Sequence, residues 1–146
     1  MPGSILLCTD GSELSISALR SGLDIVRPDA EIVIATVIAA ADPMLVTGTG
    51  FAGGTMSPED YERFEQGIET EAHAVLQHAA DALSLDASKG VVLRGDAGTT
   101  LCEFAEDRGV GAIIIGSRGN GGLKRAILGS VSDHVVRNAP CPVIVA

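Results

Sequence analysis

Glycine and serine residues in the last third of the chain are spaced in a way that suits phosphate binding. Gly116 ends an apolar segment, Gly119 follows three residues later, and Gly129 and Ser130 open a segment with helical spacing. A glycine-rich loop between a strand and a helix offers backbone N–H groups, and the helix start adds partial positive charge. The hydroxyls of Ser130 and Ser132 can also donate to an oxyanion. We therefore predict a phosphate site between residues 116 and 132.

Three basic side chains lie in the same stretch of sequence. Arg118, Lys124 and Arg125 are three of only ten basic residues, in a chain with 19 acidic residues and a formal net charge of −9. Their concentration favours an anionic ligand here. The alternative is a surface loop whose charges are solvated, and the residues alone leave it open.

A carboxylate stands directly after the first apolar segment of the chain. Asp10 precedes Gly11 and Ser12, so it ends a predicted strand and begins a turn. That position suits a ligand contact, but aspartate also initiates turns and caps helices. Both interpretations of Asp10 stay open.

Five short apolar segments must position these residues. They are Ile5–Cys8, Ile32–Ile38, Val91–Leu93 after Gly90, Ala112–Ile115 and Val143–Val145. Continuous apolar segments of this length are typical of strands buried on both faces. A stretch with helical spacing separates each strand from the next. The alternation predicts an α/β fold, with a parallel sheet covered by helices on both faces.

Capping residues mark the expected helix starts. The four starts are Ser12, Ser57 with Pro58, Thr99, and Gly129 with Ser130. The first helix carries Ile16, Leu19, Leu23 and Val26 inward and ends before Pro28. In the second, the expected inner face is Phe64, Ile68, Ala72, Val75, Ala79 and Leu83. Its expected solvated acids are Glu62, Glu65, Glu69 and Glu71.

Length and composition exclude several classes of protein. A chain of 146 residues predicts one domain, residues 1–146, and 46% hydrophobic residues rule out wholesale disorder. Net negative charge and the absence of tryptophan argue against nucleic-acid and anionic-membrane partners. Three cysteines without a CxxC pair indicate a reducing compartment. Because we find neither a signal peptide nor an apolar span of membrane length, we expect a cytoplasmic location.

Other motif matches do not have the structural context that their chemistry needs. Gly48–Gly53 matches G-x-G-x-x-G but neither follows a strand directly nor opens a helix, so a loop of unassigned role is expected at 48–54. Ser132, Asp133 and His134 are consecutive in a helix and cannot align as a catalytic relay. His73 and His78 are five residues apart, which does not suit a helical zinc pair, so both are expected in solvent.

The spacing Gly116-x-x-Gly119, nine residues, Gly129-Ser130 resembles the motif of the ATP-binding members of the universal stress protein family. Thr9-Asp10-Gly11-Ser12, Gly95-Asp96 and the ending Ala139–Val145 resemble that family too, so the similarity covers nearly the whole chain, least at residues 40–57. It implies a Rossmann-like sheet of order 3-2-1-4-5 and a nucleotide site where strands 1 and 4 diverge.

The resemblance also assigns roles to residues. Adenine contacts fall on Cys8, Thr9, Asp10 and Val37, and the ribose lies near Gly116. Phosphate contacts fall on Ser117, Arg118, Gly119, Gly129, Ser130, Val131 and Ser132. Mg²⁺ is expected to bridge phosphate oxygens, because few carboxylates stand nearby. The resemblance further implies a homodimer through the edge strand Val143–Val145.

We therefore expect a protein that binds ATP with Mg²⁺ and acts as a stress-response nucleotide sensor. We identify no general base or nucleophile, so a dedicated enzyme is not expected, although slow ATP hydrolysis stays open. The alternatives are a protein that binds AMP or cyclic AMP and a nucleotide-free interaction protein.

Overall fold

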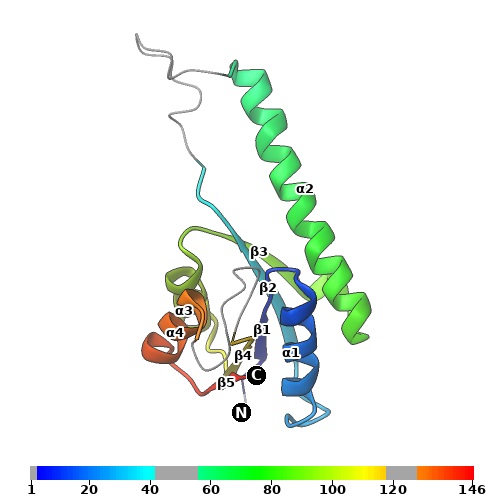
Figure 1. Cartoon of the computed structure of the whole chain (residues 1–146), viewed down its shortest axis with the longest axis vertical. Helices are drawn as coiled ribbons and strands as arrows, with labels where there is room; N and C mark the ends of the chain where they lie inside the picture. The colour runs from blue at the N-terminus through cyan, green and yellow to red at the C-terminus, as the bar shows by residue number, and fades with distance from the viewer. Residues whose placement is uncertain (1–2, 42–55, 118–127) are drawn as a thin grey trace.

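A parallel sheet of five strands forms the centre of the molecule (Figure 1). The computed structural model describes residues 3–41, 56–117 and 128–146. The strands are β1 (Ile5–Cys8), β2 (Ile32–Ile38), β3 (Gly90–Arg94), β4 (Ala112–Ile115) and β5 (Val143–Val145). All four pairings are parallel and the order is β3-β2-β1-β4-β5, which confirms the Rossmann-like fold class.

Two helices cover each face of this sheet (Figure 1). Helices α1 (Glu13–Leu23) and α2 (Pro58–Leu83) lie on one face, and α3 (Ala97–Arg108) and α4 (Ser130–Asn138) lie on the other. Successive strand residues point to opposite faces. Leu7 therefore packs with Leu19 and Leu76 under α1 and α2, whereas Leu6 packs with Leu101 and Val135 under α3 and α4.

Most helix boundaries follow the expected caps, with two corrections. Asp96, and not Thr99, is the N-cap of α3: its Oδ2 accepts the N–H of Thr99 at 3.1 Å and the Thr99 hydroxyl at 2.8 Å. Thr99 thus lies inside the helix as the donor to the cap. Helix α1 ends at Leu23, so Val26 belongs to the following turn, where its N–H donates to the carbonyl of Leu23.

Helix α2 extends well beyond the sheet. Its fully buried residues are Ala72, Leu76, Ala79 and Ala80, all in the C-terminal half, and Figure 1 shows the N-terminal half projecting past the strands. Phe64, expected on the inner face, is therefore 42% exposed. Its spacing follows the helical period, but at that height the helix has passed the sheet that covers Ala72 and Leu76.

Two ion pairs of one arginine hold this projecting helix to the edge strand. Arg94, the last residue of β3, places Nη1 2.7 Å from Oε2 of Glu65 and Nη2 3.0 Å from Oε1 of Glu69. The two glutamates were expected in solvent, yet both are half-buried because Arg94 reaches them from β3. The hydrogen bond to Glu69, and then Glu65, raises the pKa of Arg94, so this residue stays charged.

Candidate nucleotide site

The end of the sheet where β1 and β4 terminate brings together residues from distant parts of the chain. Cys8, the last residue of β1, pairs with Ile115, the last residue of β4, and with Ala35 in β2, which continues to Ile38. Thr9 and Asp10 continue β1, Gly116 and Ser117 continue β4, and Val37 lies near the end of β2. In open parallel sheets ligands bind at such a point, because the connections that leave the neighbouring strands β1 and β4 run to helices on opposite faces of the sheet.

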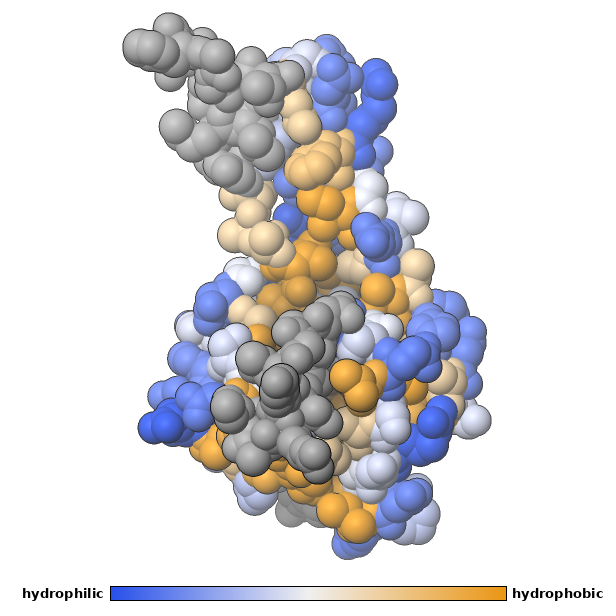
Figure 2. Space-filling model, viewed as in Figure 1, coloured by the Kyte–Doolittle hydropathy of each residue, from blue (hydrophilic) through white to orange (hydrophobic). Residues whose placement is uncertain are grey.

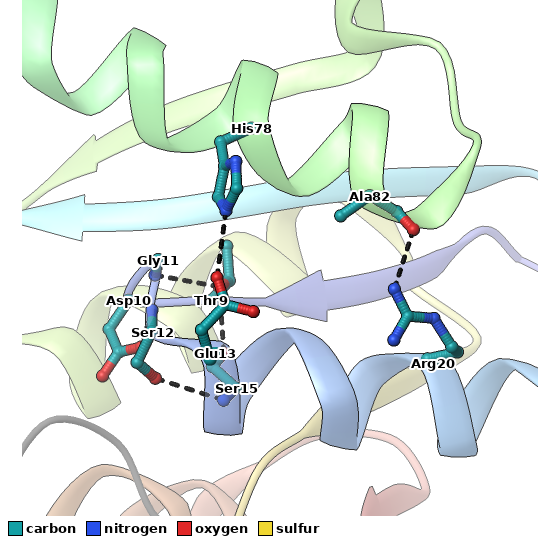
Figure 3. Close-up of polar contacts among 9 residues, drawn as sticks. All are labelled: Thr9, Asp10, Gly11, Ser12, Glu13, Ser15, Arg20, His78 and Ala82. Atoms are coloured by element: carbon teal, nitrogen blue, oxygen red, sulfur yellow. Dashed lines mark hydrogen bonds and ion pairs between the residues drawn. The ribbon is translucent and has the colours of Figure 1, made fainter.

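The Thr9 side chain organises the loop after β1. Thr9 is 6% exposed, and its Oγ1 accepts hydrogen bonds from the Gly11 N–H at 3.0 Å and from the buried Ser15 hydroxyl at 2.9 Å (Figure 3). Its own N–H donates to the carbonyl of Ala35 in β2. The side chain of Thr9 therefore shapes the loop, and its surroundings are those of a supporting residue.

Asp10 lies exposed at the tip of the same loop. Its Oδ1 accepts the Ser12 N–H at 2.9 Å, the arrangement of an Asx turn. Ser12 in turn caps α1, since its hydroxyl oxygen accepts the Ser15 N–H at 3.1 Å (Figure 3). The turn interpretation of Asp10 is thus realised, and the exposed carboxylate still stands at the strand end where a ligand contact was expected.

Helix α2 braces this loop from the side. Gly11 has φ +84°, and a Cβ there would lie 2.9 Å from Cγ1 of Val75, so only glycine suits both the backbone and the space. One turn on, Nε2 of His78 lies 3.3 Å from Oε1 of Glu13, an exposed contact drawn in Figure 3. The loop after β1 is therefore held between its own hydrogen bonds and α2.

Ser117 connects three segments on the other side of the site. Its N–H donates to the carbonyl of Ala146, and its carbonyl accepts the Gly129 N–H at 2.8 Å and the Ser132 hydroxyl at 3.2 Å. The Ser132 hydroxyl also lies 3.1 Å from the Gly129 carbonyl, and Ser132 is 2% exposed. The hydroxyl of Ser132, expected to donate to an oxyanion, is thus engaged inside the protein, whereas Ser130 is exposed.

The start of α4 differs from the other α-helix starts in the described residues. Helices α1, α2 and α3 begin with a Ser12, Ser57 or Asp96 side chain that accepts a first-turn N–H, whereas Gly129 offers α4 no side-chain cap. The first-turn donors of α4 are the N–H groups of Ser130, Val131 and Ser132. Helix starts with such donors and a positive dipole end bind anions.

Two of the four expected adenine contacts, Cys8 and Val37, are apolar. Cys8 is 5% exposed, and burial, with the nearby thiols of Cys102 and Cys141 adding, raises its pKa, so the thiol is neutral. Val37 is half-buried and packs against the same core cluster, as do Cys102, Cys141 and Val131. Of the three cysteines only Cys8 is fully buried, and none is in a disulfide.

Several expected residues lie outside the described part of the chain. Arg118, Gly119, Lys124 and Arg125 of the predicted phosphate loop are among them, as is the stretch 48–54. Within residues 3–41, 56–117 and 128–146 no group of three or more His, Cys, Asp or Glu residues is placed to hold a metal ion. In the same ranges no helix is long and apolar enough to cross a bilayer.

Two contributors to the site escaped the sequence-based prediction. Ser15 supports Thr9 from inside α1, and the backbone of Ala146 pairs with β4 and Ser117. The Ala146 contact could have been derived from strand order, because β4 and β5 are neighbours in register. Ser15 gave no signal beyond being a small polar residue at an inward helical position.

The chain matches known proteins along its full length. The family model described as "Universal stress protein family" matches residues 1–146. The universal stress protein YxiE of Bacillus subtilis is 30% identical, with 99% of each chain covered. The solved structure of the MJ0577 protein of Methanocaldococcus jannaschii superposes with a TM-score of 0.76 at 27% identity, covering 100% of this chain and 96% of the other.

Two more distant structures share the fold and are described with nucleotides. A universal stress protein in complex with cAMP has a TM-score of 0.63 at 20% identity, with 99% of this chain and 95% of the other covered. A family protein from Arabidopsis thaliana with AMP bound has a TM-score of 0.60 at 17% identity, with 99% and 90% covered. From the full-length family match and the identity with the Bacillus protein, the chain belongs to the universal stress protein family.

Proposed function

We propose that this protein binds ATP at the diverging ends of β1 and β4, with the phosphates at the start of α4. The observation that carries the proposal is that the first turn of α4 has no side-chain cap. The other three α-helices, α1, α2 and α3, each begin with a side chain that accepts a first-turn N–H. An anion bound at the start of α4 would accept hydrogen bonds from its first-turn N–H groups. It would take the role that Ser12, Ser57 and Asp96 have at the starts of α1, α2 and α3.

Each expected residue then has a role consistent with its surroundings. Adenine lies against Cys8, Thr9, Asp10 and Val37, where a neutral thiol and a valine provide apolar contact. The ribose lies near Gly116. The phosphates are held by Gly129, Ser130, Val131 and Ser132 together with Ser117, and with Arg118 and Gly119 from the loop outside the described residues. Ser132 contributes through its backbone, since its hydroxyl is bonded to Ser117 and Gly129.

The described residues suit Mg²⁺ held mainly by phosphate and water. They provide no three-residue cage, and Asp10 is an exposed carboxylate at the strand ends that could contribute one oxygen. Magnesium binds in this manner in many nucleotide sites, through one or two carboxylates plus phosphate oxygens. When bound, the ion would neutralise phosphate charge, with Asp10 able to supply one oxygen.

We propose a cytoplasmic stress-response sensor and not a dedicated enzyme. Two hydroxyl groups of the site are engaged in supporting the protein: that of Thr9 with Ser15 and Gly11, and that of Ser132 with Ser117. Slow hydrolysis of ATP is compatible with this role. The structures with cAMP and AMP support a second candidate, a preference for a monophosphate, so ATP, AMP and cyclic AMP must be titrated separately.

The test replaces Gly129 with aspartate. Gly129 has φ −63° and ψ 161°, close to the −71° and 153° of the Ser12 cap, so an aspartate there can cap α4 with its own carboxylate. The substituted carboxylate would take the N–H groups that phosphate needs and repel its charge. We expect Gly129→Asp to keep or raise thermal stability while ATP affinity by calorimetry falls at least about 100-fold.

Gly129→Ser is the matched control, because it adds a neutral cap at the same position. We expect a smaller loss of affinity, about tenfold or less. Wild-type affinity in Gly129→Asp would exclude α4 as the phosphate site. Tighter binding of AMP or cyclic AMP than of ATP by the wild-type protein would favour the second candidate.

A further inference from the structure

A cavity lies at the opposite end of the sheet from the candidate nucleotide site. Val33 and Val91, near the starts of β2 and β3, line it together with Phe104 of α3. Its volume is about 230 Å³, below the roughly 300–1,000 Å³ of pockets for drug-sized ligands. The seven residues of β2, at about 3.3 Å per residue, separate the two ends of the sheet by about 20 Å. The cavity is therefore a separate place that suits a small ligand.

Two cationic side chains border this cavity in a chain with a net charge of −9. Lys89 directly precedes β3, and Arg108 is the last residue of α3. Glu31 is the one acid in the lining, so two cations and one anion leave a local charge of +1. Acids prevail elsewhere: residues 58–71 of α2 contain six acids and one base, and Figure 2 shows hydrophilic surface along the outer edge of that half. The charge at the cavity is thus opposite to that of the whole chain.

Arg108 is held over the ring of Phe104. The spacing of four residues places both on one face of α3, and the guanidinium carbon lies 5.4 Å from the ring centroid. Within the described part of the chain Arg108 makes no ion pair with an acidic side chain, so its N–H groups can donate to a carboxylate. Because the ring already orders this side chain, less conformational entropy is lost when an anion binds.

Lys89 can also turn to an incoming anion. Its Nζ lies 3.4 Å from Oε1 of Glu31, and the two side chains are 48% and 64% exposed. An exposed ion pair of this kind contributes little to stability, so a ligand can share the ammonium group at small cost. Lys89 and Arg108 therefore provide two cations at the border of a cavity with an apolar lining.

These features together select the chemistry of the occupant. The valines and the phenylalanine ring favour a flat apolar body, and the volume limits it to about one ring. Inorganic phosphate would leave the apolar lining without a partner, and an amine would face two cations. We propose that this cavity binds a small aromatic carboxylate, with its ring against the apolar residues and its carboxylate at Lys89 and Arg108. This proposal does not depend on nucleotide binding.

The probe is benzoate, titrated into the ¹⁵N-labelled protein while the backbone amide signals are followed by NMR. Acetate lacks the ring and benzylamine reverses the charge, so these two compounds are the matched ligand controls. We expect benzoate to bind with a Kd of about 1 mM, which fits a ligand of about nine non-hydrogen atoms. Acetate and benzylamine should bind at least about tenfold more weakly. The largest shifts should fall on residues 89–91 and 104–108, and added ATP should leave the benzoate affinity unchanged.

Two pairs of variants locate the binding. Arg108→Gln should weaken benzoate binding about fivefold, whereas Arg63→Gln, at an exposed position of the projecting half of α2, changes the net charge equally and should have no effect. Val91→Thr adds a hydroxyl to the apolar lining and should weaken binding about threefold. Val92→Thr, whose side chain packs on the other face of the sheet, is its control. The amide spectrum of each variant verifies that it remains folded.

Glu31 gives a test of opposite sign. Because Glu31 competes with the ligand for Lys89, we expect Glu31→Gln to tighten benzoate binding about twofold. A loss of affinity in Glu31→Gln would contradict the assignment of the carboxylate to Lys89.

Three further results would overturn the proposal. They are no benzoate binding at about 20 mM, equal affinities for benzoate and acetate, and equal effects of Arg108→Gln and Arg63→Gln. Displacement of benzoate by ATP would place benzoate in the nucleotide site instead. Failure of ATP to bind, with benzoate still bound at this cavity, would contradict the proposed nucleotide function and leave this proposal supported.

Discussion

Ser130 and Ser132 lie two positions apart in the first turn of α4, and their hydroxyls have different surroundings. Ser132 is buried and bonded to two carbonyls, whereas Ser130 is exposed. We expect Ser132→Ala to lower the free energy of unfolding in urea by about 1 kcal/mol, the usual value of one buried hydrogen bond. Ser130→Ala should stay within about 0.5 kcal/mol of wild type.

The effects of the two substitutions on nucleotide affinity should have the opposite order to their effects on stability. Ser130→Ala removes a hydroxyl proposed to contact phosphate, so we expect ATP to bind several-fold more weakly at unchanged stability. Ser132→Ala keeps its N–H and should bind ATP within about twofold of wild type in the folded protein. A stability loss in Ser130→Ala equal to that in Ser132→Ala would contradict the separation of roles.

At the scale of the element, the cap of α3 makes a pH-dependent contribution to stability. The pKa of Asp96 is lowered from 3.8, first by the N–H of Thr99 and then by its hydroxyl. A carboxyl with a lowered folded pKa stabilises the fold above its unfolded pKa, and the contribution disappears as pH falls through the folded value.

Asparagine at position 96 keeps an acceptor but does not titrate. We therefore expect the difference in melting temperature between wild type and Asp96→Asn to favour wild type near pH 7 and to shrink as pH falls below about 4. Asp107 is an exposed acid near the other end of α3, and Asp107→Asn serves as the control. The difference in melting temperature between this variant and wild type should not shrink in the same way. A difference for Asp96→Asn that stays constant down to about pH 2 would show that the carboxylate is not the titrating cap.

The elements themselves show what the sequence can predict. The strands were readable because a segment such as Ala112–Ile115 is apolar on both faces, and Ser12 and Ser57 gave the starts of α1 and α2. Asp96 and Thr99 are both capping residues three apart, and only their mutual hydrogen bond decides between them. Phe64 was misplaced because helical periodicity does not reveal where the sheet ends.

For the candidate site, too, the positions of residues along the chain could be predicted, but their contact partners could not. Gly129 was expected at the start of α4 and is there, but the partner of the Ser132 hydroxyl depends on how Ser117 folds back from β4. Likewise Glu65 and Glu69 could be placed on a helix face, but not opposite Arg94, which is 25 residues from Glu69 in sequence.

At the scale of the whole molecule, β5 is an edge strand with one free side in the described sheet. Pro142 and Ala146 bond to β4 through backbone groups, so alternate residues, Val143 and Val145, direct theirs outward. We propose that the homodimer implied by the family resemblance forms by antiparallel pairing of this edge through those outward backbone groups. Val145→Pro removes an outward N–H and keeps the bonds to β4, since proline is tolerated on edge strands.

We expect the wild-type protein to sediment as a dimer and Val145→Pro to sediment at half that mass, with little change in melting temperature. Val136→Ser, at an exposed residue of α4, should remain dimeric. A Val145→Pro protein that keeps the dimer mass would assign the contact to another surface. Loss of the folded state would instead be visible by circular dichroism, and Val143→Pro would then repeat the measurement at the other outward position.

Helix α2 projects far beyond the point where Val75 lies beside Gly11, so a small tilt about that point would move its N-terminal tip a long way. The helix is a rod of about 39 Å, and Val75 lies about 26 Å along it from Pro58. A tilt of about 5° around Val75 would displace the tip by about 2 Å, a distance that spectroscopic rulers on the tip and the body can resolve. Because Glu65 and Glu69 lie between Val75 and Pro58, the Arg94 contacts oppose any such tilt and keep the tip in place.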